Sequence, residues 1–225
     1  MGFVHLHCHT QYSLLDGAIK LPDLIEKTKS FGQDTAAITD HGVLYGAMEF
    51  YEKAGKAGIK PIIGCEVYLA PGSMKSRELV PGQPKNYHLV LLAQDLTGYR
   101  NLIKLVSKAH VEGFYYRPRV DREALEEYNK GLLALSACLQ GEVPYWLLRG
   151  AEDRALDALD FYRATFDGRF YLEIQSNGLE DQNTVNPLII DLGRRHGVPV
   201  VATNDCHYLL KSDAKAHEAL LCIQT

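Results

Sequence analysis

Short apolar runs recur along the chain, and stretches with helical periodicity separate most of them. Seven runs rich in Val, Ile, Leu and Tyr predict strands over residues 3–7, 35–39, 61–69, 88–93, 131–136, 169–174 and 198–202. Amphipathic patterns predict helices over residues 21–31, 47–57, 99–110, 155–166 and 186–196. An irregular segment at residues 71–86, rich in Pro, Gly, Lys and Ser, predicts an exposed loop.

Alternation of strands with helices favours parallel strands joined by helical crossovers. The strand runs are almost continuously apolar, which is typical of strands covered on both faces. We therefore predict an α/β fold, a TIM-like barrel of about seven strands in a single domain over residues 1–225, with the loop at 71–86 near the barrel mouth. The sequence stops inside an apolar helical pattern at residues 220–225, so we expect an N-terminal fragment of a longer chain.

Composition narrows the class of protein. A hydrophobic content of 46% with 23% charged residues is ordinary for a soluble globular protein. A net charge of −4 argues against a strong non-specific nucleic-acid binder, but not against an enzyme that meets phosphates through metal ions. No apolar run reaches the roughly 18 residues of a membrane span. Five irregularly spaced cysteines predict no disulfide framework, and we expect a reducing cytoplasm.

Two triplets near opposite ends of the chain carry the strongest chemical signal. They are His7-Cys8-His9 and Asp205-Cys206-His207, and each follows an apolar run. Alternate residues of an extended chain point the same way, so each triplet aims two metal-capable side chains at one side and turns its cysteine away. The two pairs can share a site only if the fold brings the first and last strands together, as a closed barrel does.

Other metal-capable side chains lie near the predicted strand ends, where parallel barrels gather their active-site residues. The full candidate set holds five imidazoles, three carboxylates and one thiol: His7, His9, Asp16, His41, Glu66, His88, Cys138, Asp205 and His207. Zinc takes about four ligands, so nine candidates predict two or three divalent ions bridged by a carboxylate. Mixed nitrogen, oxygen and sulfur ligands favour zinc, with manganese or iron as alternatives. Such clusters hydrolyse phosphoesters.

Some of these placements leave alternatives open. His88 begins its predicted strand rather than ending it, and the run at 169–174 is followed only by poor ligands. Cys138 has the alternative of a small buried core thiol. Asp16 has the alternative of a turn residue that precedes Gly17. A lone histidine is more often structural than metal-binding, but nine grouped candidates reverse that expectation.

Four further residues are candidates for supporting roles. Asp40 is expected to orient an imidazole and to serve catalysis with the carboxylates Glu66 and Asp205. His5 shares the face of His7 but lies deeper, so we expect it behind the ligands. Arg117 and Arg119, near two tyrosines, are candidate contacts to a DNA backbone, with a solvated loop as the alternative.

The motifs also resemble a known family. His7-x-His9, the segment 38–42, Gly64-x-Glu66, His88 and Asp205-x-His207 are similar to the motifs of the PHP (polymerase and histidinol phosphatase) superfamily. The longer stretches 5–17, 112–119, 202–208 and 217–225 resemble the N-terminal PHP domain of the alpha subunit of bacterial DNA polymerase III. The resemblance covers essentially the whole chain.

The resemblance implies a distorted (β/α)7 barrel with a trinuclear metal centre at the C-terminal ends of the strands. One metal would be held by His7, His9, Glu66 and Asp205. Glu66 would bridge to a second metal, held by His88 and Cys138. The third would be held by Asp16, His41 and His207.

The implied activity is a metal-dependent 3′–5′ exonuclease, acting on the 3′ end of a DNA primer strand, in a longer chain that would carry the DNA polymerase. The implied partners are the rest of that chain, the sliding clamp and a proofreading subunit. Two alternatives remain. The domain could be a catalytically silent, metal-stabilised scaffold that supports the polymerase or binds a proofreading subunit. It could also hydrolyse small phosphate monoesters, as the histidinol phosphatase branch does.

Overall fold

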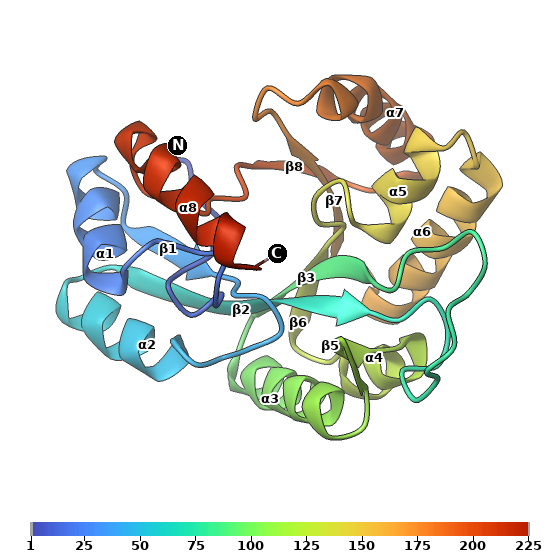
Figure 1. Cartoon of the computed structure of the whole chain (residues 1–225), viewed down its shortest axis with the longest axis horizontal. Helices are drawn as coiled ribbons and strands as arrows, with labels where there is room; N and C mark the ends of the chain where they lie inside the picture. The colour runs from blue at the N-terminus through green and yellow to red at the C-terminus, as the bar shows by residue number, and fades with distance from the viewer. Residues whose placement is uncertain (1, 225) are drawn as a thin grey trace.

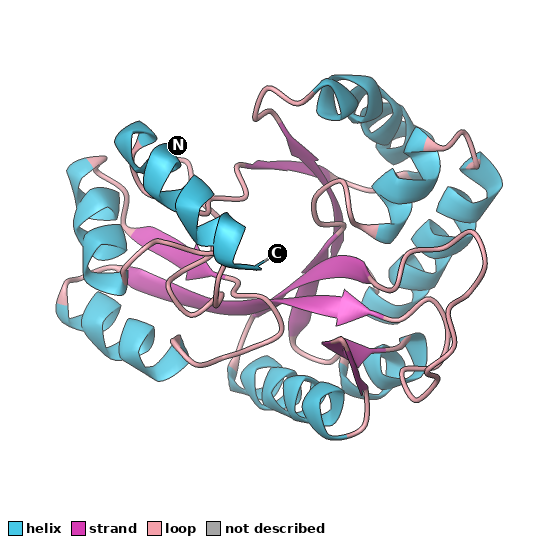
Figure 2. Ribbon diagram, viewed as in Figure 1, coloured by secondary structure: helices cyan, strands magenta, loops and turns pink. Residues whose placement is uncertain are grey.

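A curled β-sheet occupies the centre of the computed structural model, and helices surround it (Figures 1 and 2). The structure describes residues 2–224, so Met1 and Thr225 of the expected domain lie outside the described residues. The strands are β1 (Thr35–Ile38), β2 (Lys60–Leu69), β3 (Tyr87–Ala93), β4 (Phe114–Tyr115), β5 (Arg117–Val120), β6 (Leu132–Leu135), β7 (Phe170–Gln175) and β8 (Val200–Thr203). The helices are α1 (Leu21–Ser30), α2 (Ala47–Lys56), α3 (Leu96–Val111), α4 (Arg122–Tyr128), α5 (Glu142–Leu148), α6 (Glu152–Phe166), α7 (Glu180–His196) and α8 (Ala214–Gln224).

The sheet runs in the order β4-β5-β2-β3-β6-β7-β8, with β1 also paired to β2. The long strand β2 connects these parts, since Lys60–Ile63 pair with β1 and the following residues pair with β3. This curled sheet with its surrounding helices confirms the α/β class and the distorted barrel.

The segment at residues 5–9 closes the barrel without forming a regular strand. On one side, the backbone N–H groups of Ala37 and Thr39 donate to the carbonyls of His5 and Cys8. On the other, the His9 N–H donates to the Cys206 carbonyl and the Cys206 N–H donates to the His7 carbonyl, which forms an isolated parallel bridge between Cys8 and Cys206. The predicted strand over residues 3–7 is therefore wrong as regular structure. The predicted meeting of the two chain ends is confirmed.

β3 corrects the expectation that all strands are parallel. It runs antiparallel to both of its neighbours, β2 and β6, whereas β1–β2, β6–β7 and β7–β8 are parallel pairs. Reversal places the beginning of β3 at the edge where its neighbours end. This explains why His88, at the start of its strand, still reaches that edge.

Alternation along the strands divides the apolar residues into two layers. One face of β2 and β3 points outward, where Cys65, Val67, Leu89 and Leu91 pack in the large core shared with α3 to α7. The other face points into the barrel, which is filled by a small cluster that includes Val90, Leu92 and Leu135. His88 and Glu66 continue this inward row, so the strand period of two delivers them to the barrel interior above an apolar floor.

The helices follow the amphipathic pattern, with differences at their ends. α1 buries Leu21, Leu24, Ile25 and Thr28, the i, i+3, i+4, i+7 spacing of one helix face. α7 begins before the predicted start at residue 186 and continues through Pro187. The short helices α4 and α5 and the hairpin β4–β5 were not predicted from the apolar pattern, because each is too short to show periodicity.

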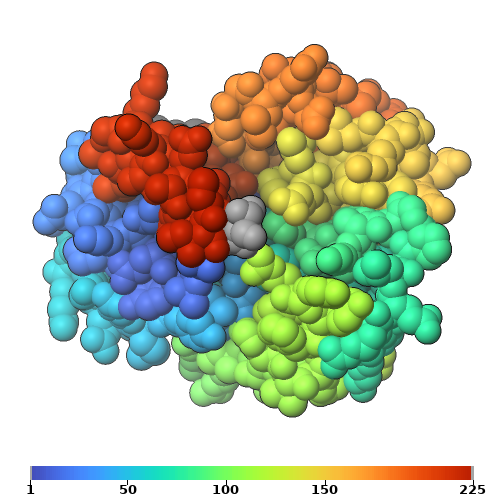
Figure 3. Space-filling model, viewed as in Figure 1, coloured from blue at the N-terminus to red at the C-terminus, as the bar shows by residue number. Residues whose placement is uncertain are grey.

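The last helix lies against the beginning of the chain. In Figure 3, α8 (red) covers part of the N-terminal region (blue). His217 on α8 bonds through Nε2 to the backbone carbonyl of Asp16 at 2.7 Å. The segment at 71–86 is irregular and mostly exposed, as expected, and joins the end of β2 to the start of β3.

Within residues 2–224, no helix combines the length and the apolar character that crossing a bilayer requires.

The start of α3 provides a test of the packing. Asp95 caps this helix by accepting a bond from the Gly98 N–H at 2.8 Å. A β-carbon on Gly98 would lie 1.8 Å from the backbone oxygen of Gly131. Gly98→Ala should therefore lower the free energy of unfolding by about 1–3 kcal/mol in urea denaturation. Gly55→Ala on α2, where a β-carbon meets no atom within 4 Å, should instead raise it by up to about 1 kcal/mol. Equal changes in the free energy of unfolding for the two variants would contradict the close contact between Gly98 and Gly131.

Candidate metal centre

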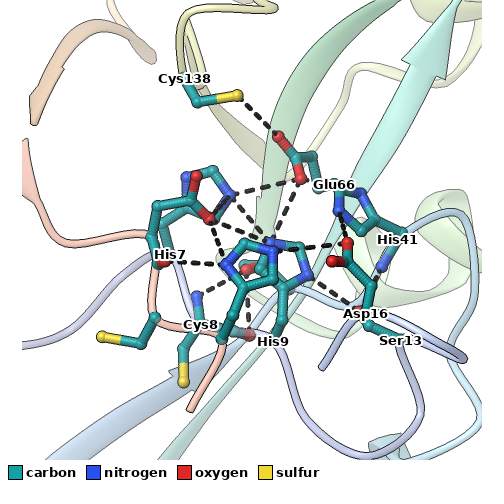
Figure 4. Close-up of polar contacts among 12 residues, drawn as sticks. His7, Cys8, His9, Ser13, Asp16, His41, Glu66 and Cys138 are labelled. Atoms are coloured by element: carbon teal, nitrogen blue, oxygen red, sulfur yellow. Dashed lines mark hydrogen bonds and ion pairs between the residues drawn. The ribbon is translucent and has the colours of Figure 1, made fainter. Parts of the chain in front are cut away.

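Four ligand-type atoms from three parts of the chain converge in the barrel interior (Figure 4). They are His7 Nε2, His9 Nε2, Glu66 Oε2 and Asp205 Oδ1. The two imidazole nitrogens lie 3.2 Å apart. Glu66 Oε2 lies 3.4 Å from His7 Nε2 and 3.2 Å from His9 Nε2. Asp205 Oδ1 lies 3.2 Å and 3.3 Å from the same two nitrogens.

These separations fit a tetrahedral metal site. Zinc bonds of about 2.0–2.1 Å at tetrahedral angles place ligand atoms about 3.3–3.5 Å apart. Asp205 Oδ1 is buried and, among the described residues, makes no hydrogen bond despite its two close imidazole neighbours. Its neighbours therefore point at a common centre rather than at one another. The residues present fit a divalent cation.

The second oxygen of Glu66 faces a different group. Oε1 lies 3.0 Å from His88 Nδ1, at the start of β3. Cys138, in the loop after β6, places Sγ 3.9 Å from Glu66 Oε1 and 3.8 Å from His88 Nδ1. Cys138 thus faces polar atoms and is not part of the apolar clusters, which argues against the alternative of a core thiol.

Asp16 forms a third group with two imidazoles. Its Oδ2 lies 2.9 Å from His41 Nε2 and 3.5 Å from His207 Nε2. The other ring nitrogen of His41 lies 2.9 Å from Glu66 Oε2, so this group adjoins the first. The carboxylate of Asp16 is engaged with imidazoles and not with the backbone of its own turn. All nine candidate ligands from the sequence are thus brought together.

Hydrogen bonds fix three of the imidazoles so that Nε2 faces the cluster. His9 Nδ1 lies 2.9 Å from Ser13 Oγ, which donates its own hydrogen to Asp40, so the imidazole must be the donor. His7 Nδ1 donates to Glu173 Oε1 at 2.7 Å. His207 Nδ1 donates to the backbone oxygen of Asp205 at 3.0 Å. Partners of this kind set the tautomer of metal-binding histidines.

Two of these supporting residues were missed by the sequence analysis. Glu173 is a buried carboxylate in β7 that also accepts bonds from Gln175 and Thr203. A charged residue inside the apolar run 170–174 was the available signal, because buried carboxylates need partners. Ser13 carried no comparable signal, since its role depends on where the loop after residue 9 turns.

Asp40 and His5 contact the candidate ligands indirectly. Within residues 2–224, the Asp40 carboxylate forms no hydrogen bond with an imidazole. This carboxylate accepts bonds from the Thr10 N–H and hydroxyl and from Ser13, so it reaches His9 only through Ser13. The Nδ1 atom of His5 lies 3.6 Å from Cys206 Sγ, so His5 reaches the candidate ligands only through the neighbours of Cys206 in the chain.

Arg117 and Arg119 differ in their exposure to solvent. Arg119 is buried, and its guanidinium donates to the backbone oxygens of Met74, Ser76 and Gly113. Its expected contact with DNA is therefore wrong, because the group holds the loop at 71–86. Arg117 is exposed, lies over the ring of Tyr68, and forms no ion pair among the described residues.

A cleft of about 160 Å³ opens beside the third group. Asp16 and His41 line its inner end, and Arg117 lines its side. Its other walls are formed by Tyr12, Leu14, Val43, Tyr45, Tyr68, His110 and Pro118. The side chains of Leu14 and Tyr45 are more than half exposed. The cleft therefore combines a cation, aromatic faces and direct access to the candidate ligands.

Charges of opposite sign stabilise one another in the cluster. Burial would raise the pKa of Glu66, but His88, His41 and His7 outweigh it and hold that pKa well below its usual range. The pKa of Asp205 and that of Asp16 are likewise lowered, against burial, by neighbouring imidazoles. Burial raises the pKa of the Cys138 thiol. The thiol therefore stays protonated unless a cation lies beside it.

Comparison with known proteins places this geometry in a family. The family model described as "PHP domain" matches residues 5–177. The chain belongs to the PHP family. Curated relatives of this PHP domain include the alpha subunits of DNA polymerase III from Treponema pallidum (48% identical) and Thermus aquaticus (50% identical), each match covering 100% of this chain. The expected resemblance to the N-terminal PHP domain of DNA polymerase III alpha subunits is confirmed. The chain spans only 19% of the length of these relatives.

Solved structures support the fold. A candidate metal-dependent phosphoesterase from Bifidobacterium adolescentis aligns with a TM-score of 0.60 at 15% identity, covering 97% of this chain and 95% of the other. An amidohydrolase from Chromobacterium violaceum aligns with a TM-score of 0.54 at 16% identity, covering 97% of each chain. At such identities the likeness shows the barrel architecture alone.

The charge balance predicts how the metal-free protein responds to pH. Burial would lower the pKa of His41, but Glu66 and Asp16 outweigh it and raise this pKa to about 9. A raised folded-state pKa stabilises the fold fully below the unfolded value of about 6.5, and this contribution is lost as pH rises through about 9. With chelator present, the free energy of unfolding should fall by about 1–3 kcal/mol between pH about 6 and about 10. His41→Gln should reduce this slope in urea denaturation, and His7 and His207, whose pKa values neighbouring carboxylates also raise, should carry the remainder. An identical dependence of unfolding free energy on pH in the wild type and in His41→Gln would contradict the raised pKa of His41.

Proposed function

We propose that this PHP domain is a metal-dependent phosphodiesterase that removes nucleotides from the 3′ end of DNA, within a longer DNA polymerase III alpha chain. The observation that carries the proposal is the convergence of His7, His9, Glu66 and Asp205 at tetrahedral spacing, where Asp205 Oδ1 has no hydrogen-bond partner in the part of the chain that the structure describes. The named relatives supply the polymerase context, and the first structural neighbour is described as a metal-dependent phosphoesterase.

The nine candidate ligands divide into three groups that adjoin at Glu66. His7, His9, Glu66 and Asp205 would hold one ion, and Glu66 would share a second with His88 and Cys138. Asp16, His41 and His207 would hold a third. Zinc fits the mixed donor set best, with manganese or iron as alternatives. Bound ions would activate water and neutralise phosphate charge, so a chain of net charge −4 can accept DNA.

The chain's own residues orient this chemistry. Glu173 and Ser13 hold the rings of His7 and His9 with Nε2 facing inward. Asp40 supports catalysis by anchoring Ser13, one step removed from the reacting atoms. The cleft beside Asp16 would receive the terminal nucleotide. There Arg117 would meet a phosphate, and the exposed ring of Tyr45 would stack against a base.

A direct assay tests the activity. Protein purified without chelator and loaded with zinc, manganese or iron should shorten a single-stranded DNA labelled at its 5′ end into a ladder of products. A DNA with its label at the 3′ end should release labelled mononucleotide first. Intact DNA with every metal would contradict the proposal. Rapid hydrolysis of a small phosphate monoester with DNA untouched would favour the monoesterase alternative.

One observation also favours a structural role. The candidate ligands join residues 7 and 9 to residues 205 and 207, so bound metal would tie the two ends of the barrel together. A scaffold of this kind would support the rest of the polymerase chain, or hold a proofreading subunit or sliding clamp nearby. Chelation that lowers the melting temperature of a protein lacking nuclease activity would favour the scaffold over the exonuclease.

Glu66 provides the sharpest test of metal sharing. Its two oxygens face different ligand groups, so Glu66→Gln should lose two ions per chain at once, measured by elemental analysis after gel filtration. His196→Ala, at the end of α7 and outside the cluster, is the matched control and should lose none. Full metal content in Glu66→Gln would refute the shared carboxylate.

Arg117 provides a test of substrate binding apart from metal binding. Arg117→Ala should weaken binding of single-stranded DNA by about tenfold and flatten its salt dependence, because one charged phosphate contact is lost. Its metal content should stay unchanged. Arg100→Ala, an exposed arginine on α3 that does not line the cleft, is the control. Equal DNA affinity for both variants would remove Arg117 from the binding surface.

A further inference from the structure

A pair of cysteines lies directly behind the metal-ligand candidates. Cys8 and Cys206 are the middle residues of the two triplets, and they face each other across the isolated parallel bridge. Figure 4 shows the side chain of Cys8 pointing away from the cluster. In this pairing the two cysteines are direct neighbours on adjoining segments. Neither has a role in the function proposed above.

We propose that Cys8 and Cys206 form a redox modification site, where a peroxide joins them in a disulfide that loosens the metal centre. Neighbouring strands lie about 4.7–4.9 Å apart, within the Cα separation of about 4.4–6.8 Å that disulfides span. The residues are already paired by backbone bonds, His9 N–H to the Cys206 carbonyl at 2.8 Å and Cys206 N–H to the His7 carbonyl at 3.2 Å. The two segments are already held side by side, so only a small further approach of the backbones is needed to join the sulfurs.

The different surroundings of Cys206 and Cys8 give the two sulfurs different chemical roles. Cys206 is half-buried and its Sγ lies 3.6 Å from His5 Nδ1, so a small oxidant can reach it beside a base. Cys8 is only 1% exposed and is shielded from direct attack. Hydrogen peroxide would convert the Cys206 thiol to a sulfenic acid and release one water. The Cys8 sulfur would then attack that sulfur, forming the disulfide and releasing a second water.

The disulfide would act on the ligands through the backbone. Cys8 lies between His7 and His9, and Cys206 lies between Asp205 and His207. A disulfide draws the paired Cβ atoms to about 3.8 Å and thereby pulls the two segments together. Metal–ligand distances normally lie within about 0.2 Å of their standard values, so a shift of the ligand-bearing segments weakens the bonds to the metal. Oxidation should therefore lower metal affinity, and a thiol reductant should restore it. This consequence rests on the proposed metal centre, whereas formation of the disulfide does not.

Mass spectrometry tests the modification itself. The protein is treated with hydrogen peroxide, with and without bound zinc; its remaining thiols are alkylated, and it is digested without reduction. We expect a peptide pair joined through Cys8 and Cys206. In Cys8→Ser, sulfenic acid should accumulate on Cys206 and be trapped by dimedone. Cys222→Ser, which alters an exposed cysteine on α8, should behave as the wild type. A disulfide elsewhere, or none, would overturn the proposal.

Competition with a chromophoric chelator tests the coupling. Peroxide should lower zinc affinity of the wild type by about tenfold or more, and dithiothreitol should restore it. Cys206→Ser should keep its affinity after the same treatment, which separates this effect from oxidation of Cys138. A disulfide without loss of affinity would overturn the coupling. Reduced protein that binds no zinc would contradict the proposed function instead, while the peptide map would still decide whether the disulfide forms.

Discussion

The buried carboxylate of Glu66 is the group on which the rest of the site depends. It lies 1% exposed in the barrel interior, within 3.4 Å of the nitrogens of four imidazoles from three other segments of the chain. An unpaired carboxylate at this depth would be costly, so the fold must surround it with partners. Those partners are the same atoms that a divalent cation requires. Stability and candidate chemistry therefore share one set of contacts.

Two departures from an ideal barrel bring partner side chains to the Glu66 carboxylate. β3 is reversed relative to its neighbours, which turns His88 toward Glu66 from the beginning of a strand. The segment at residues 5–9 replaces a regular strand and contacts both β1 and the region after β8. His7 and His9 thereby meet Asp205, although nearly the whole chain separates them. The distortion of the barrel is thus tied to the position of the site.

The sequence predicted the composition of the site better than its supporting geometry. Metal-capable side chains at strand ends could be recognised, because the end of a strand is marked by a change from apolar to polar residues. The direction of β3 could not, since an apolar run reads the same for a parallel and an antiparallel strand. Arg119 looked like its exposed neighbour Arg117, because burial of a loop residue depends on which loop folds over it. The role of Ser13 depends on how the loop after residue 9 turns, and the sequence gives no signal for that turn.

Anomalous scattering from crystals of the zinc-loaded protein would test the central claim most directly. The account predicts peaks on both sides of the Glu66 carboxylate. One peak should lie among His7, His9 and Asp205, and another should lie beside His88 and Cys138. Absence of any peak within bonding distance of Glu66, or a single peak touching only one of its oxygens, would contradict the account.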